Sequence, residues 1–178
     1  MAYTSSQIVQ AVPTGINSAL VLIKTQTIGT TVSSVTVSDV FSSTYDNYRI
    51  IVSGGIASTQ NRLNLTFGAT ATGYYRFTIY GNYTSTTVTG ENASNTDKFA
   101  DAGTGSANSL VSNIEVFAPN LAKRTSIITN TSTSETGQYV FTQQGFLNDS
   151  TQYTAFTLTT STGTITGGTI RVYGYTNS

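Results

Sequence analysis

Short runs of β-branched and aromatic residues, separated by turn-forming residues, recur along this chain and constrain its fold more than any other feature. The stretch 45–56 has this pattern: Asp46 and Asn47 favour a turn, and the apolar run that follows ends at two glycines. Alternate residues of a strand point to opposite faces, and both faces of this run carry apolar side chains. We therefore expect a central strand of an all-β domain.

Other segments have the same strand-like composition, and clusters of Gly, Asn, Asp, Ser and Pro separate them. They predict an antiparallel β-sandwich of nine or ten strands, for which we favour a jelly roll over an immunoglobulin-like sandwich. In a jelly roll the terminal strand would lie beside the strand at 45–56. We interpret 81–107 as a long loop with one short strand near 83–89, and Gly103 to Gly105 as a hairpin turn. The expected strands are 19–28, 32–37, 62–67, 74–80, 109–117, 124–129, 138–143, 153–159 and 169–175.

The first residues differ from the rest of the chain, so we divide it into an N-terminal arm, 1–18, and a β-sandwich domain, 19–178. Ile8, Val9 and Val12 precede Pro13 and Gly15, which break any regular element. Two interpretations remain open. The arm is either a flexible terminus or a segment that becomes ordered when its aliphatic residues pack on a neighbouring subunit.

Composition argues against most kinds of chemistry. The chain has no cysteine and no histidine, so the usual nucleophile–base pairs and the common zinc sites are absent. Charged residues make up 9%, and the eight Lys and Arg residues are scattered apart from Lys123 and Arg124, which argues against a nucleic-acid partner. No apolar stretch is long enough to span a membrane, and no export signal is recognisable. We expect no enzyme activity, no cofactor and no metal.

A few carboxylates could in principle form an acid–base pair or a calcium site. Asp39 could pair with Asp46, and Glu91 with Asp97 or Asp101; Asp97 and Asp101 are also spaced for a loop that binds calcium. Asp39 and Asp46 stand where turns favour Asp, and no dense run of oxygen ligands surrounds the other three. We expect turn formation and solubility from all of them.

Tyrosine is the remaining signal, with eleven residues in the chain. In segment 74–80, Tyr74, Arg76 and Tyr80 share one face and the aromatic and aliphatic residues between them share the other. We expect one face to be buried and the other to offer phenols to solvent or to a partner. Tyr suits a partner surface because it gives a large contact area at low entropic cost. With the arm, the candidate protein-interaction residues are Ile8, Val9, Val12, Tyr74, Arg76 and Tyr80.

Four segments carry a resemblance to known proteins: 37–55, Gly-Tyr-Tyr at 73–75, Ala-Lys-Arg-Thr at 122–125, and the closing run 163–175. Beyond about Ala19 the chain resembles small virion structural proteins of tailed bacteriophages, particularly those of cyanobacterial and other marine phages. The resemblance implies a β-sandwich on the virion exterior, either on the capsid or on a tail fibre or spike. Similar decoration proteins often form trimers at symmetry axes.

The expected function is therefore that of a non-enzymatic capsid decoration, or cement, protein. It would assemble onto the virion in the host cytoplasm and stabilise the shell by binding across major capsid subunits, as a homo-oligomer for which a trimer is favoured. The alternative is a tail-fibre or spike module that binds host surface glycan through Tyr and hydroxyl groups. The absence of a long repetitive shaft favours decoration.

Overall fold

The computed structural model describes residues 19–132 and 139–177, and in these residues every regular element is a β-strand. None of them belongs to a helix that is long and apolar enough to cross a membrane. The predicted all-β class is confirmed. The strands are β1 (Leu20–Thr27), β2 (Ser34–Val37), β3 (Asn47–Ser53), β4 (Ile56–Ala57), β5 (Asn61–Phe67), β6 (Tyr74–Asn82), β7 (Val88–Thr96), β8 (Phe99–Gly105), β9 (Leu110–Phe117), β10 (Thr125–Ser132), β11 (Tyr139–Leu147), β12 (Phe156–Thr160), β13 (Ile165–Thr166) and β14 (Thr169–Tyr175).

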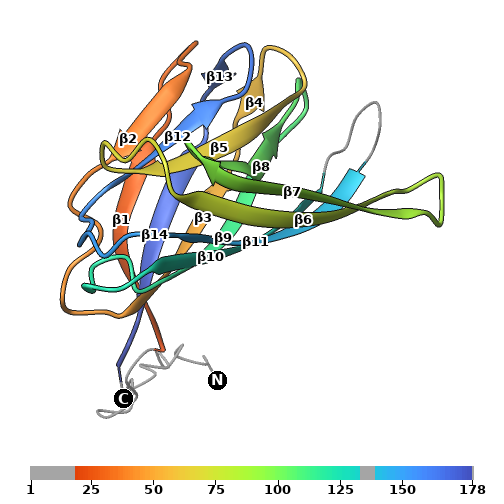
Figure 1. Ribbon diagram of the computed structural model, residues 1–178. Helices are drawn as coiled ribbons and strands as arrows, with labels where there is room; N and C mark the ends of the chain where they lie inside the picture. The colour runs from red at the N-terminus through yellow and green to blue at the C-terminus, as the bar shows by residue number, and fades with distance from the viewer. Residues whose placement is uncertain (1–18, 133–138, 178) are drawn as a thin grey trace, which may run out of the picture.

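Two antiparallel layers form the body of the molecule (Figure 1). One layer has the order β1-β14-β3-β9 and the other β2-β12-β5-β8, and the β8–β9 hairpin joins them. Two layers of four strands in this order are compatible with the predicted jelly roll. β14 pairs with β3 along its length, as expected for the terminal strand and the strand at 45–56. β4 and β13 form a separate two-stranded sheet.

The hydrophobic core lies between these two layers. Tyr48, Ile50 and Val52 of β3 are fully buried, as are Leu63 and Phe67 of β5 in the opposite layer. Both sets follow the alternation of the sequence, so each strand turns its more apolar face to the other sheet. The Tyr48 hydroxyl donates to the carbonyl of Ser42 at 2.8 Å, which satisfies the polar end of this buried ring.

A four-stranded extension continues the first layer beyond β9, in the order β10-β11-β6-β7 (Figure 1). Its strands are insertions relative to the two four-stranded layers: the β6–β7 hairpin comes between β5 and β8, and the β10–β11 hairpin comes between β9 and β12. β8 lies against the inner face of the extension. Phe99 of β8 packs so closely on Gly145 of β11 that a Cβ atom at this glycine would lie 2.7 Å from the ring. The other face of the extension, which we call the outer face, points away from the body.

The prediction of a long loop over residues 81–107 is wrong, because most of this segment forms β7 and β8. β7 is the edge strand of the extension, with most of its residues exposed, so it needs few apolar side chains. β8 is buried but built from small residues, because its neighbours lie close to its backbone: a Cβ atom at Gly103 would lie 2.7 Å from that of Ser112. Gly103 to Gly105 accordingly ends β8 and is not the predicted hairpin turn.

Candidate functional site

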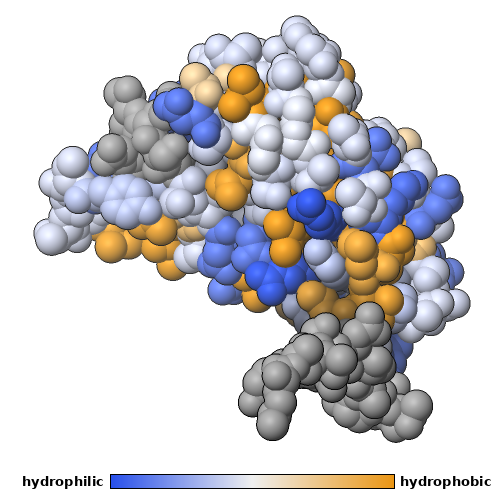
Figure 2. Space-filling view, turned by 180° about the vertical axis from the view of Figure 1, so that it is seen from behind, coloured by the Kyte–Doolittle hydropathy of each residue, from blue (hydrophilic) through white to orange (hydrophobic). Residues whose placement is uncertain are grey.

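The outer face of the extension carries large exposed hydrophobic side chains, and its described strand residues are uncharged. Phe77 is 51% exposed, Ile79 44%, Val88 69% and Val140 47%. Figure 2 shows hydrophobic residues gathered on the extension, seen from behind the view of Figure 1. In the register of β7, β6, β11 and β10, none of the described residues that share this face is Asp, Glu, Lys or Arg. An exposed apolar surface of this kind is typical of an interaction site.

Three of these side chains form what we call the distal apolar surface: Ile79, Val88 and Val140. Gly81 of β6 pairs with Val88 on one side and with Val140 on the other. Because Gly81 has no side chain, the two valines flank a shallow hollow of about 290 Å³. Ile79, one position along the same face, lines the same hollow. The surface therefore combines a depression with an apolar rim, which suits the insertion of an apolar side chain from a partner.

The inner face of the extension holds a network of ion pairs centred on Asp101 of β8. This carboxylate is 1% exposed, and it lies 2.9 Å from Nη1 of Arg76 and 2.7 Å from Nη1 of Arg62. Arg76 is itself 9% exposed and also lies 3.1 Å from Glu91, while the Thr78 hydroxyl donates to Asp101 at 3.3 Å. The network joins β5, β6, β7 and β8 and so connects the extension to the body. Its carboxylates are committed to arginines, which favours a structural role.

The backbone at Asp101 is also unusual. Its φ of 63° lies in the left-handed region, which Asn and Asp tolerate better than most other residues. Nothing in the sequence indicates this geometry or the partners of Asp101, because Arg76 and Arg62 lie 25 and 39 residues away along the chain. The single available signal was an isolated Asp in a run of small residues.

Tyr74 and Arg76, two of the predicted contact residues, point to the inner face and not to a partner. Tyr74 is fully buried, its ring packs edge-on against Phe99 with centroids 4.9 Å apart, and its hydroxyl accepts the Phe67 N–H at 2.9 Å. Burial raises the pKa of this phenol to about 12. Tyr80 is partly exposed, next to Tyr139. The two faces of β6 alternate as predicted, but the face that bears Tyr74 and Arg76 is the one that β8 covers.

The arm residues and the turn carboxylates were also predicted from the sequence. Ile8, Val9 and Val12 lie outside the described residues. Asp39 has a φ of 57° between β2 and β3, a conformation that Asp tolerates in turns. The backbone of Asp46 bonds to Asn177 and Ala118, which are distant in the sequence, so its turn-forming role stays a prediction.

The remaining loop carboxylate, Asp97, pairs with the adjacent Lys98 at 3.1 Å, away from the Asp101 network. Within residues 19–132 and 139–177, no group of three His, Cys, Asp or Glu residues could hold a metal ion.

The chain was compared with protein-family models, with curated proteins and with solved structures, and none of them matches it.

Proposed function

We propose that this protein is a non-enzymatic structural protein of a phage virion, a capsid decoration protein that docks through the distal apolar surface of its extension. The exposure of Ile79, Val88 and Val140 on a projecting, uncharged sheet face is the observation that carries the proposal. The assignment to a virion rests on the sequence resemblance, and the jelly-roll-compatible body supports it. The major capsid protein is the partner, and a trimer is the oligomer we favour.

Docking through this surface would stabilise the shell by mass action, because a protein that binds the assembled lattice and not free subunits favours the lattice. Each side chain is about half exposed, so its burial contributes about 1 kcal/mol. Replacing Ile79, Val88 and Val140 together by serine should weaken attachment by about 3 kcal/mol, or roughly a hundredfold in Kd. The predicted arm, 1–18, would add a second contact.

Two measurements test the proposal. Quantitative mass spectrometry of purified virions should count hundreds of copies per particle, whereas a handful of copies would indicate the tail-fibre or spike alternative. Purified protein should also bind virions of a phage that lacks the gene for this protein, and the triple serine variant should not.

Ile56→Ser provides the matched control, because Ile56 is 46% exposed against 44% for Ile79 but lies on β4, outside the extension. Equal occupancy by the control and the triple variant would refute docking through the distal apolar surface.

A further inference from the structure

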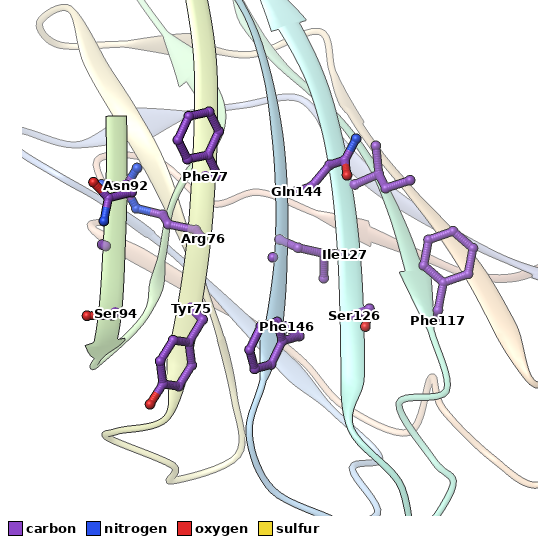
Figure 3. Close-up of a pocket in the computed structure, with 13 residues that line it drawn as sticks. Tyr75, Arg76, Phe77, Asn92, Ser94, Phe117, Ser126, Ile127, Gln144 and Phe146 are labelled. Carbon is purple, nitrogen blue, oxygen red and sulfur yellow. The ribbon is translucent and has the colours of Figure 1, made fainter. Parts of the chain in front are cut away.

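A second feature of the outer face lies beside the distal apolar surface: a groove of about 560 Å³ that crosses five strands, β7, β6, β11, β10 and β9 (Figure 3). We call it the aromatic groove. Four interstrand spacings give it a length of about 19 Å, which suits an extended ligand of several units. Its lining includes the aromatic rings of Tyr75, Phe77, Phe117 and Phe146 and the polar groups of Asn92, Ser94, Ser126 and Gln144.

Two of the aromatic rings hold each other in place. Tyr75 and Phe146 are directly paired across β6 and β11, and their rings stack with centroids 4.9 Å apart and planes at 5°. The Arg124 guanidinium lies 5.3 Å from the centroid of the Phe146 ring. Phe77 lies two residues along β6, and Phe117 closes the other end of the groove (Figure 3). The stacked pair therefore presents an apolar surface at a position that packing has already ordered.

The polar groups lie between these rings and have no hydrogen-bond partners among the described residues. Asn92 and Gln144 pair with Phe77 from the two neighbouring strands, so an amide stands on each side of this ring. Ser126 lies between Phe146 and Phe117 in the next row. Within the part of the chain that the structure describes, the side chains of Asn92, Ser94, Ser126 and Gln144 make no hydrogen bond. Each amide can both donate and accept, and so can each hydroxyl.

The charge and hydrogen-bonding groups of the groove distinguish three classes of ligand: nucleic acids, apolar protein surfaces and neutral sugar chains. Nucleic acids need cations along the backbone path, but the guanidinium of Arg76 is turned to the inner face by Asp101 and Glu91, and Arg124 stands at the rim. An apolar protein partner would bury the four polar groups without hydrogen bonds, which is unfavourable. A neutral sugar chain has apolar C–H faces for the rings and hydroxyl groups for the amides and serines. We propose that the aromatic groove binds a neutral oligosaccharide.

This binding goes beyond the proposed docking function and does not depend on it. The distal apolar surface lies towards the tip of the extension, and the groove lies towards the body, with Ile79 and Phe77 as the nearest residues of the two.

Saturation-transfer difference NMR on the full chain tests the proposal, with cellohexaose, maltohexaose and mannohexaose as neutral probes and hexagalacturonic acid as the charged one. At least one neutral probe should receive saturation, and Asn92→Ala and Gln144→Ala should each weaken its binding about tenfold. Neither variant should change the melting temperature, because neither side chain forms a hydrogen bond to another described residue. Asn130→Ala is the matched control: Asn130 is an exposed amide on the same face but outside the groove, and its loss should leave the affinity unchanged.

Three results would overturn the proposal. One is the absence of saturation transfer to all three neutral hexasaccharides. Another is binding of hexagalacturonic acid alone, which would mean that charge and not the groove selects the ligand. The third is a concentration-dependent dimer that Phe77→Ala abolishes, because the groove would then be an interface between copies of this chain.

Discussion

Removing the charge of Asp101 should destabilise the protein more than any other change of a single charge, because this carboxylate is buried between two arginines. Asp101→Asn keeps the size of the side chain and tolerates the left-handed backbone, so it isolates the charge. It leaves the buried guanidinium of Arg76 with Glu91 as its remaining carboxylate.

The expected loss follows from the burial of each partner. Breaking a buried ion pair costs about 3–5 kcal/mol, and we expect the lower end, about 3 kcal/mol, because Glu91 still compensates Arg76 in part. Arg62 is 46% exposed, so its pair with Asp101 adds little. Asp101→Ala should cost about 1–2 kcal/mol more than Asp101→Asn, because alanine disfavours the left-handed backbone.

Urea denaturation followed by circular dichroism measures this loss. With a slope of about 2 kcal/mol/M, a loss of 3 kcal/mol lowers the midpoint by about 1.5 M. Asp97→Asn is the matched control: its pair with Lys98 is exposed, and its removal should cost less than about 1 kcal/mol. Combining Asp101→Asn with Arg76→Met should recover part of the loss, because the double variant removes the uncompensated buried cation.

The reasoning would be refuted if Asp101→Asn and Asp97→Asn shifted the midpoint equally. It would also be refuted if Arg76→Met added its full cost to that of Asp101→Asn, since the two side chains would then be energetically independent.

Three further predictions concern buried groups and the backbone. Burial raises the pKa of Tyr74 from 10.0 to about 12, so the folded state holds this proton more tightly than the unfolded state, and the free energy of unfolding should fall by about 2 kcal/mol as the pH rises from 10 to 12. Tyr74→Phe leaves the Phe67 N–H unpaired and should cost about 1–3 kcal/mol at pH 7. Above pH 10 the variant should lose less stability than the wild type, because it has no phenol to ionise. If the urea midpoints of the two proteins fell equally across this pH range, Tyr74 would not be the group responsible. Thr129→Val should raise the melting temperature by about 2–4 °C, because the buried hydroxyl has no hydrogen-bond partner among the described residues, and a decrease would mean that an ordered water binds it. Gly168→Ala should lower the free energy of unfolding, measured by urea denaturation, more than Gly167→Ala does. Both glycines have positive φ, but an added Cβ atom would lie 2.5 Å from a backbone nitrogen at Gly168 and would meet nothing within 4 Å at Gly167. Equal losses in the two variants would rule out the clash.

The strands that a local pattern specifies were predictable. In β5, Leu63, Leu65 and Phe67 alternate with more polar residues and are all fully buried. β3 was predicted to be central, and it lies between β14 and β9. Alternation and turn residues act within a few positions of one another, so a sequence carries them directly.

β8 could not be predicted in this way. Most of its residues are small because Ser112 and Leu63 on the neighbouring strands approach its backbone closely, and these approaches exist only once the sheets have packed. A run of Ala, Gly and Thr looks like a loop when its neighbours are unknown. The same limit applies to Asp101, whose arginine partners come from β5 and β6.

The sequence by itself determined the all-β class, most strand positions and the pairing of the terminal strand with the strand at 45–56. Tertiary structure decided which face of β6 is available to a partner. Both faces of this strand carry aromatic residues, so its pattern does not distinguish inside from outside. Because β8 packs on the face that bears Tyr74 and Arg76, Phe77 and Ile79 are left exposed on the outer face, where both the distal apolar surface and the aromatic groove lie.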